Sequence, residues 1–163
     1  MGRKLFDVTS SSVYSLLDKI EDGTIALPEI QRPFVWPNSS VRNLFDSMYK
    51  GFPVGYLLVW ATGAEADAKQ IGTNDKQSVA SQLIVDGQQR LTSLYAVIKG
   101  HKIVTKDYKE ERVRLAFRPE DGKFEVLDAA IENDPEFVPD ISVLYKGKFH
   151  SFVQNFLKQL EEH

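Results

Sequence analysis

The chain has 163 residues, of which 42% are hydrophobic and 26% charged, a composition typical of one globular domain with a core of its own. Because the sequence contains no cysteine, it excludes disulfide bonds, thiolate chemistry and zinc–cysteine sites. The net charge of −3 predicts weak non-specific attraction to DNA, and neither a signal peptide nor a membrane-spanning run of ~20 apolar residues is present, so we expect a cytoplasmic protein.

The first part of the chain predicts two helices with a strand between them. Apolar residues at helical spacing mark the first helix over residues 13–20. Residues 25–30 form a short apolar strand, and Pro28 favours an edge position or the end of that strand. Asn38 or Ser39 is the expected N-cap of the second helix.

The middle of the chain supplies most of the expected sheet. Residues 56–60 are apolar without interruption, which predicts a buried central strand. Residues 61–80 are polar and show no periodicity, so we expect a surface loop that is either functional or a solvated insertion. A second apolar strand, residues 83–85, leads directly into a helical apolar pattern over residues 91–98.

The last part of the chain predicts a hairpin and a final helix. Residues 112–117 and 123–127 are expected to pair across a turn. Residues 149–160 carry an apolar helical stripe that closes the core or leads into a second domain. The whole pattern predicts an α+β fold, with a small mixed sheet flanked by helices. We expect a single domain of residues 1–163, either complete or the N-terminal part of a longer protein.

Polar side chains are concentrated where the strand at 83–85 meets the following helix. Residues 86–92 read Asp-Gly-Gln-Gln-Arg-Leu-Thr, which indicates a tight turn followed by a helix start. Backbone N–H groups at a helix N-terminus favour anions, and the planar fork of Arg90 suits phosphate oxygens. A cation in the first helical turn opposes the helix dipole unless an anion is near. Arg90 therefore indicates a phosphate site, or else an exposed arginine or one paired with an aspartate.

The other residues of this stretch each have two interpretations. Gly87 permits a positive φ and lets a ligand approach the backbone, but an ordinary strand–helix turn uses glycine in the same way. Asp86 can hold Mg²⁺ or can cap the following helix. Gln88 and Gln89 can read a base, orient a water molecule or remain solvated. Thr92 faces the same end and can add a hydroxyl group.

A second Gln-Arg pair follows the strand that contains Pro28. Gln31 and Arg32 would complete a clamp around the distributed charge of a triphosphate, unless Arg32 is a surface arginine held by Glu29. If the two strands that precede the Gln-Arg pairs are neighbours, their C-terminal ends open onto one crevice. Trp36 lies between two loop prolines, where its indole stacks on a base or pins the loop to the core.

These two elements resemble one known family. Residues 86–90 are similar to the DGQQR signature of GmrSD-type restriction endonuclease N-terminal domains, and residues 27–36 are similar to the P-x-x-Q-R-x-x-x-W element near their N-terminus. The resemblance implies a ParB/sulfiredoxin-like fold that binds and hydrolyses nucleoside triphosphates in defence against foreign DNA. It also implies that DNA is cut by a partner or by a separate C-terminal nuclease domain.

On this resemblance we expect a nucleoside triphosphate, with Mg²⁺, to sit at the start of the helix that follows Gly87. Asp86 and Arg90 are the catalytic candidates, Asp86 is the metal candidate and Trp36 is the base-stacking candidate. The expected nucleotide-binding residues are Gln31, Arg32, Gly87, Gln88, Gln89, Arg90 and Thr92. Two other functions stay open: a DNA-binding or modified-base-sensing domain without hydrolysis, and a protein-interaction module, such as a homo-oligomer, built on the final helix.

Other sequence patterns exclude two kinds of catalytic site and suggest a charged surface. The sequence lacks a G-x-x-x-x-G-K-[ST] phosphate loop and a pair of histidines at metal-ligand spacing, so we expect no P-loop chemistry and no histidine–metal nuclease in these residues. A basic belt between the 91–98 helix and the predicted hairpin is a solvated face or, less favoured because acidic residues dilute it, a DNA track. Its members are Lys99, His101, Lys102, Lys106, Lys109, Arg112, Arg114 and Arg118.

Overall fold

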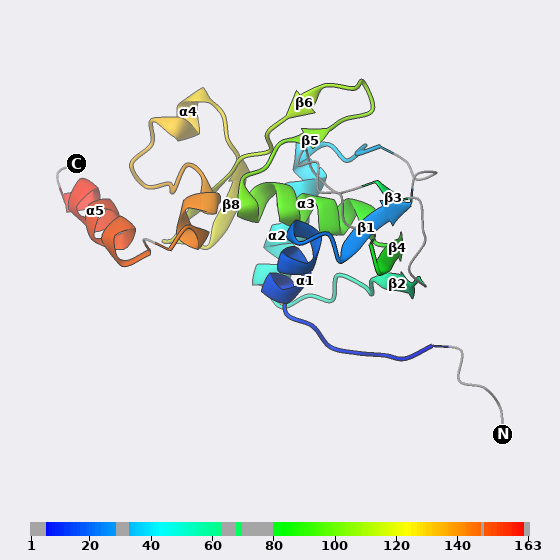
Figure 1. Cartoon of the computed structure of the whole chain (residues 1–163). Helices are drawn as coiled ribbons and strands as arrows, with labels where there is room; N and C mark the ends of the chain where they lie inside the picture. The colour runs from blue at the N-terminus through cyan, green and yellow to red at the C-terminus, as the bar shows by residue number, and fades with distance from the viewer. Residues whose placement is uncertain (1–5, 29–32, 63–67, 70–79, 148, 162–163) are drawn as a thin grey trace.

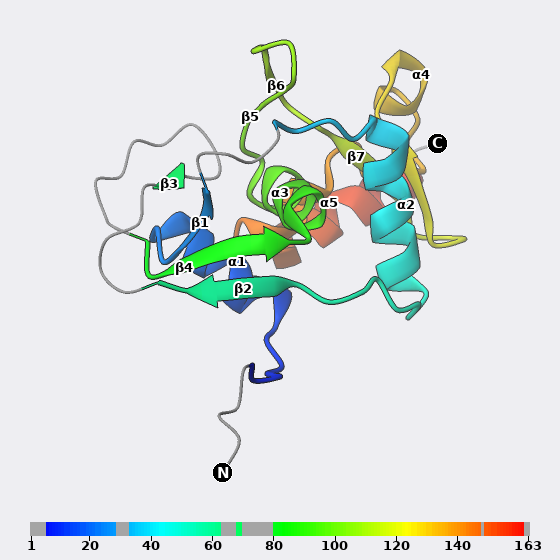
Figure 2. The ribbon, with the colours of Figure 1, turned by 90° about the vertical axis from the view of Figure 1, so that its right-hand side faces the viewer.

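A four-stranded mixed sheet with the strand order β2-β4-β1-β3 lies at one end of the fold (Figures 1 and 2). The predicted α+β fold, with a small mixed sheet flanked by helices, is confirmed. The structure is a computed structural model, and it describes residues 6–28, 33–62, 68–69, 80–147 and 149–161.

The two strands that precede the Gln-Arg pairs are neighbours in this sheet. β1 (Ile25–Pro28) and β4 (Gln82–Asp86) run parallel to each other. β2 (Leu58–Ala61) pairs antiparallel with the other side of β4, and β3 (Ala68–Lys69) pairs antiparallel with the other side of β1. Pro28 is therefore the last residue of an inner strand, which is the strand-end position that the sequence allowed.

Helix α3 (Gln88–Lys99) is the central element of the fold, because every residue from Leu91 to Ile98 is buried. α1 (Val13–Glu21) packs against α3 and β1, and α2 (Asn38–Tyr49) packs mainly against a C-terminal hairpin. A helix that is buried on all sides needs neighbours on all sides, and Figure 2 shows them around α3. Helix α3 reaches the surface only at its two ends, in the half-buried first turn and at Lys99.

The C-terminal half adds two hairpins and three helical segments. The hairpin of β7 and β8 is the one that the sequence predicts. The elements are β5 (Ile103–Val104), β6 (Glu110–Glu111), β7 (Leu115–Arg118), β8 (Lys123–Val126), α4 (Ala129–Glu132), the 3-10 helix η1 (Ile141–Tyr145) and α5 (Phe149–Glu161).

Helix α5 lies at the far end of the molecule from the sheet and packs mainly against η1 (Figure 1). None of its residues is buried, although its apolar stripe is as predicted. The final helix therefore does not close the core. Neither α5 nor any other helix in the described ranges is long and apolar enough to cross a membrane.

The prediction of a buried central strand at residues 56–60 is wrong. β2 begins at Leu58 and lies at the edge of the sheet, where Leu58 and Trp60 are 54% and 64% exposed. Only Val59, between them, is half-buried, because it alternates to the other face of the strand. A continuous apolar run indicates strand formation, but it does not by itself show that both faces are covered.

Two smaller expectations also differ from the structure. Pro37, rather than Asn38 or Ser39, is the N-cap of α2, and it has no side-chain capping bond. Asn38 is the first helical residue, and its Nδ2 atom donates to Glu111 Oε1 at 3.4 Å. The segment 61–80, predicted to be a loop, contains the short strand β3, while residues 63–67 and 70–79 lie outside the described residues.

Candidate functional site

The stretch of residues 86–90, called the 86–90 turn below, joins β4 to α3. Gly87 is the N-cap of α3 and has a φ of +88°, in the left-handed region that favours glycine. A Cβ atom at this position would collide with Leu57 Cδ2 and lie 3.2 Å from Arg90 Nη2. The first helical hydrogen bond runs from Leu91 N to Gly87 O, at 3.0 Å. Helix geometry thus leaves the N–H groups of Gln89 and Arg90 without an acceptor inside α3.

Arg90 is held on two sides by the protein. Its Nη1 atom donates to the carbonyl oxygen of Val54 at 2.6 Å, and its Nη2 atom forms an ion pair with Asp86 Oδ2 at 3.3 Å. The side chain of Arg90 is 20% exposed, whereas that of Asp86 is 74% exposed. Arg90 therefore has an aspartate partner, as one interpretation of the sequence allowed, and its phosphate-binding role stays a prediction. The capping role for Asp86 is not seen, because Gly87 occupies the cap position.

The segment after α2 forms a wall of the 86–90 turn that sequence reasoning missed. Gly55 has a φ of +87°, and a Cβ atom there would lie 2.5 Å from Arg90 Nη1. The backbone at Val54 and Gly55 therefore lies against the guanidinium group. The only sequence signal was the Gly-Phe-Pro-Val-Gly run at residues 51–55, which marks a turn but not its partner.

Gln89 ties the 86–90 turn to a second loop. Its Oε1 atom accepts a hydrogen bond from Val35 N at 2.9 Å, and its Nε2 atom donates to Pro33 O at 3.2 Å. Of the roles predicted for Gln89, the solvated one is wrong, because both ends of the amide are occupied by backbone groups. Gln89 is thus a structural clamp between α3 and the loop that returns from β1.

We expect Gln89→Ala to lower the free energy of unfolding by about 1–3 kcal/mol, since two backbone groups lose their partners. Chemical denaturation measures this change. Gln159→Ala on α5 is the matched control, because it makes the same substitution at an exposed helical position. Equal stabilities of the two variants would show that the clamp contributes nothing.

The two strands that precede the Gln-Arg pairs lie side by side as predicted, but the position of the first Gln-Arg pair is not described. Because β1 and β4 are parallel neighbours, their C-terminal ends lie at the same edge of the sheet. Gln31 and Arg32, and also Glu29, lie outside the described residues. The clamp of Arg32 and Arg90 around a triphosphate thus stays a prediction.

Trp36 and Thr92 are placed in the interior more than the sequence suggested. Trp36 is half-buried and packs against the core, so it pins its loop to the core as one interpretation of the sequence held. The same residue lines a cavity of about 500 Å³ beside the loop.

Thr92 is 6% exposed, and its Oγ1 atom has no hydrogen-bond partner within the described part of the chain. Gln88, half-buried, is the first residue of α3.

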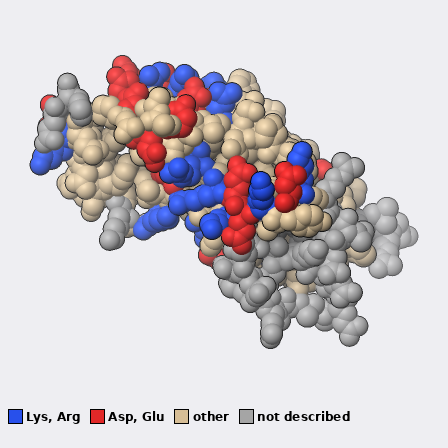
Figure 3. Space-filling view, turned by 90° about the horizontal axis from the view of Figure 1, so that it is seen from above, with Lys and Arg blue, Asp and Glu red and all other residues tan. Residues whose placement is uncertain are grey.

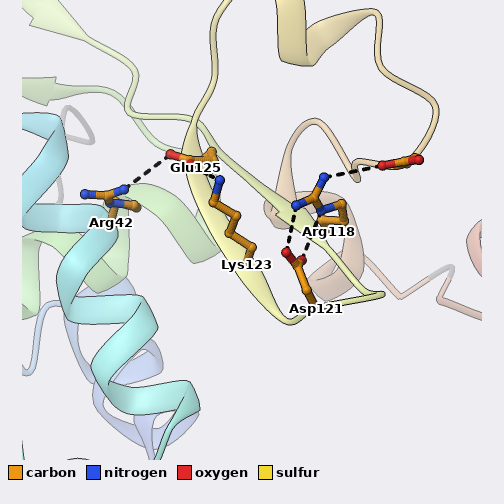
Figure 4. A network of polar contacts seen from close by, with 6 residues as sticks. Arg42, Arg118, Asp121, Lys123 and Glu125 are labelled. Atoms are coloured by element: carbon orange, nitrogen blue, oxygen red, sulfur yellow. Dashed lines mark hydrogen bonds and ion pairs between the residues drawn. The ribbon is translucent and has the colours of Figure 1, made fainter.

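Most of the basic belt is neutralised within the protein. Figure 3 shows Lys and Arg side chains interleaved with Asp and Glu over the face seen from above. A hydrogen bond to Glu21 is the main cause that raises the pKa of Lys99, and hydrogen bonds to Asp121 likewise raise the pKa of Arg118 (Figure 4). The pairs are Lys99 with Asp18 and Glu21, His101 with Glu21, Lys102 with Glu110, Arg112 with Asp140, Arg114 with Glu132, and Arg118 with Asp121 and Glu136.

Arg42 on α2 belongs to another network of charged side chains. Its Nη1 atom forms an ion pair with Glu125 Oε2 at 3.3 Å, and Lys123 pairs with the same carboxylate (Figure 4). This contact fastens α2 to β8, so Arg42 has a structural partner away from the 86–90 turn.

The described residues contain no group of three or more His, Cys, Asp or Glu side chains that could hold a metal ion by themselves. The turn still fits Mg²⁺, because this ion is commonly held by only one or two carboxylates together with substrate phosphates and water. Asp86 supplies such a carboxylate at the exposed rim of the turn.

Comparison with known proteins defines the class. Residues 13–162 match the family described as the N-terminal domain of GmrSD restriction endonucleases. The chain belongs to this family. An uncharacterized protein of Methanocaldococcus jannaschii is 30% identical over 98 residues, which is 55% of this chain and 17% of that protein. The chain thus matches only a small part of that relative's length.

Proposed function

We propose that the 86–90 turn binds the phosphates of a nucleoside triphosphate with Mg²⁺, and that the domain hydrolyses this nucleotide within a DNA restriction system. The observation that carries the proposal is the left-handed Gly87 between β4 and α3, with the Arg90 guanidinium beside it. Family membership supports the restriction part of this proposal, since the family is that of a restriction endonuclease domain.

The electrostatics of the turn suit a polyanion. The N–H groups of Gln89 and Arg90 lie in the first turn of a 12-residue helix, where the dipole favours negative charge. The missing side chain at Gly87 lets phosphate oxygens approach this backbone. The buried part of α3 is fixed on all sides, so these donors are organised before the ligand arrives.

Arg90 is placed to neutralise the phosphates with little loss of side-chain freedom. The Val54 carbonyl fixes one end of its guanidinium group, and the other end faces the exposed carboxylate of Asp86. Since a guanidinium group has five donors, phosphate oxygens can add to or replace the contact with Asp86. Arg32 is proposed as a second phosphate ligand from the return loop.

Asp86 is the residue that would hold Mg²⁺ at the turn. When bound, this ion neutralises charge on the phosphates and favours displacement at phosphorus. The residues of the chain bind and orient the triphosphate. Water forms a bond to the terminal phosphorus while the bond from that phosphorus to the bridging oxygen breaks, and a nucleoside diphosphate, inorganic phosphate and a proton are released. DNA cleavage is proposed to come from a separate domain or protein.

A thermal-shift experiment with each nucleoside triphosphate, with and without Mg²⁺, tests the proposal. A ligand at a hundred times its dissociation constant adds about 2.7 kcal/mol of stability. For a domain of this size we expect Tm to rise by roughly 5–11 °C. Inorganic phosphate at the same ionic strength is the control, and no shift with any triphosphate at millimolar concentration would contradict nucleotide binding.

A further inference from the structure

We infer that the cavity between the Phe34–Asn38 loop and the β5–β6 hairpin is a second nucleotide site, which receives an unpaired nucleotide of a nucleic-acid strand. This site goes beyond the proposed triphosphate site and uses different residues. It has an apolar floor, a polar rim and a volume of about 500 Å³, within the range of ligand pockets.

The floor of the cavity is apolar and rigid. Phe34, Ile103 and Val113 are buried members of the core, and Trp36 packs against the same core from the loop. An aromatic ring that is fixed by packing stacks on a flat base with little loss of freedom. The polar lining consists of Asn38, Thr105, Lys106, Asp107, Lys109 and Glu111.

The walls of the cavity are joined before any ligand binds. Phe34 and Thr105 form a parallel backbone bridge, and Lys106 N donates to Phe34 O at 3.2 Å. Asn38 Nδ2 donates to Glu111 Oε1 at 3.4 Å, and both residues also line the cavity. Because these contacts connect the loop to the hairpin, binding requires little ordering of the protein.

The charges of the lining favour a nucleotide over a bare phosphate. Within the described residues, Lys106 and Lys109 are the members of the basic belt that form no ion pair, and both line this cavity. Asp107 and Glu111 balance them, so a phosphate alone gains little. A nucleotide can place its phosphates at the lysines and its base donors at the carboxylates.

The tip of the hairpin points to a strand rather than a free nucleotide. Tyr108 is 90% exposed. Among the residues that the structure describes, it is the only non-glycine residue with a positive φ, which is 56°. This uncommon conformation occurs at an aromatic residue that stands, with Asp107, between Lys106 and Lys109 in the sequence. Aromatic rings beside cations are the usual platform for successive bases of a single strand.

Tryptophan fluorescence gives a direct readout of cavity binding. The chain has two tryptophans, and Trp60→Phe removes the exposed one on β2 so that only Trp36 reports. We expect a short single-stranded DNA octamer to quench Trp36 emission saturably. The same sequence as a duplex is expected to bind at least tenfold more weakly. No quenching by the octamer, or equal binding of the duplex, would overturn the proposal.

Charge reversal tests the role of the lysines. Lys106→Glu with Lys109→Glu is expected to weaken octamer binding at least tenfold and to lower the slope of log K against log salt by about 1.4. Lys146→Glu with Lys158→Glu, at exposed positions near α5, has the same net charge and is the matched control. Equal losses in both double variants would mean that bulk charge, not the cavity, binds DNA.

Two further variants complete the test. The first shows whether the cavity and the triphosphate site are independent, and the second shows whether the cavity prefers a nucleic-acid strand to a mononucleotide. Arg90→Ala is expected to bind the octamer as the wild type does. Octamer binding would therefore still be observed if the 86–90 turn proved not to bind nucleoside triphosphates. Tyr108→Asn, with a residue that tolerates positive φ, is expected to weaken the octamer severalfold and leave a mononucleotide unchanged. A site that binds only the free mononucleotide, or loses the octamer in Arg90→Ala, would contradict the inference.

Discussion

Arg90→Ala is expected to weaken nucleoside triphosphate binding by about 2–3 kcal/mol, or roughly 30–150-fold. The reason is the loss of the charge-assisted, forked contact with phosphate that is proposed for Arg90. Isothermal titration calorimetry measures the change. Arg114→Ala is the matched control, because this arginine also forms an ion pair, with Glu132 at 3.2 Å, but lies in the basic belt.

The same substitution also removes the hydrogen bond to Val54 O, so stability is measured alongside affinity. Arg90→Lys keeps the positive charge and loses the fork, and we expect an intermediate affinity. A folded Arg90→Ala protein that binds nucleotide as the wild type does would remove Arg90 from the phosphate site.

Gly87→Val is expected to be the most damaging single change at the turn. Left-handed backbone at a non-glycine residue costs about 1–3 kcal/mol, and the new side chain also collides with Leu57 Cδ2. Nucleotide binding is expected to be lost as well, because the side chain would cover the backbone that is proposed to face the phosphates. Chemical denaturation and calorimetry give the two readouts.

Gly51→Val separates the two causes of damage at Gly87. Gly51 has a φ of +75°, and a Cβ atom there meets nothing within 4 Å. It therefore has the backbone strain without the collision. We expect Gly87→Val to destabilise the protein by about 1–3 kcal/mol more than Gly51→Val. If the two variants lose equal stability, the contact with Leu57 does not constrain the turn.

The local features of the site could be predicted from the sequence because they depend on neighbouring residues. The order of apolar strand, Asp-Gly and helical stripe predicted β4, the turn at Gly87 and α3, and all are present. Gly100, with a φ of 70°, ends α3 as expected of a glycine after a helical pattern. The ParB/sulfiredoxin-like assignment stays a prediction.

The contacts that shape the site could not be predicted because they join distant segments. Arg90 donates to Val54, 36 residues earlier, and Gln89 bridges to Val35, 54 residues earlier. No local pattern encodes which backbone carbonyl a side chain will meet. For the same reason the edge position of β2 was missed, since exposure depends on neighbouring strands.

The cavity beside Trp36 illustrates the same limit. The sequence indicated that Trp36 either stacks on a ligand or pins its loop to the core, and the structure shows the core contact. That Lys106 and Lys109 line the same space depends on the bridge between Phe34 and Thr105. Neither composition nor periodicity indicates that two segments so far apart in the sequence form a backbone bridge.

The most direct test of the triphosphate site is an NMR titration that follows each backbone amide. With a nucleoside triphosphate and Mg²⁺, we expect the largest chemical-shift changes at Gly87, Gln88, Gln89 and Arg90, because their N–H groups lie closest to the proposed phosphates. Changes centred on Thr105–Glu111 and Trp36 instead, with the 86–90 turn unaffected, would place the nucleotide in the cavity and contradict the phosphate-binding role of the turn.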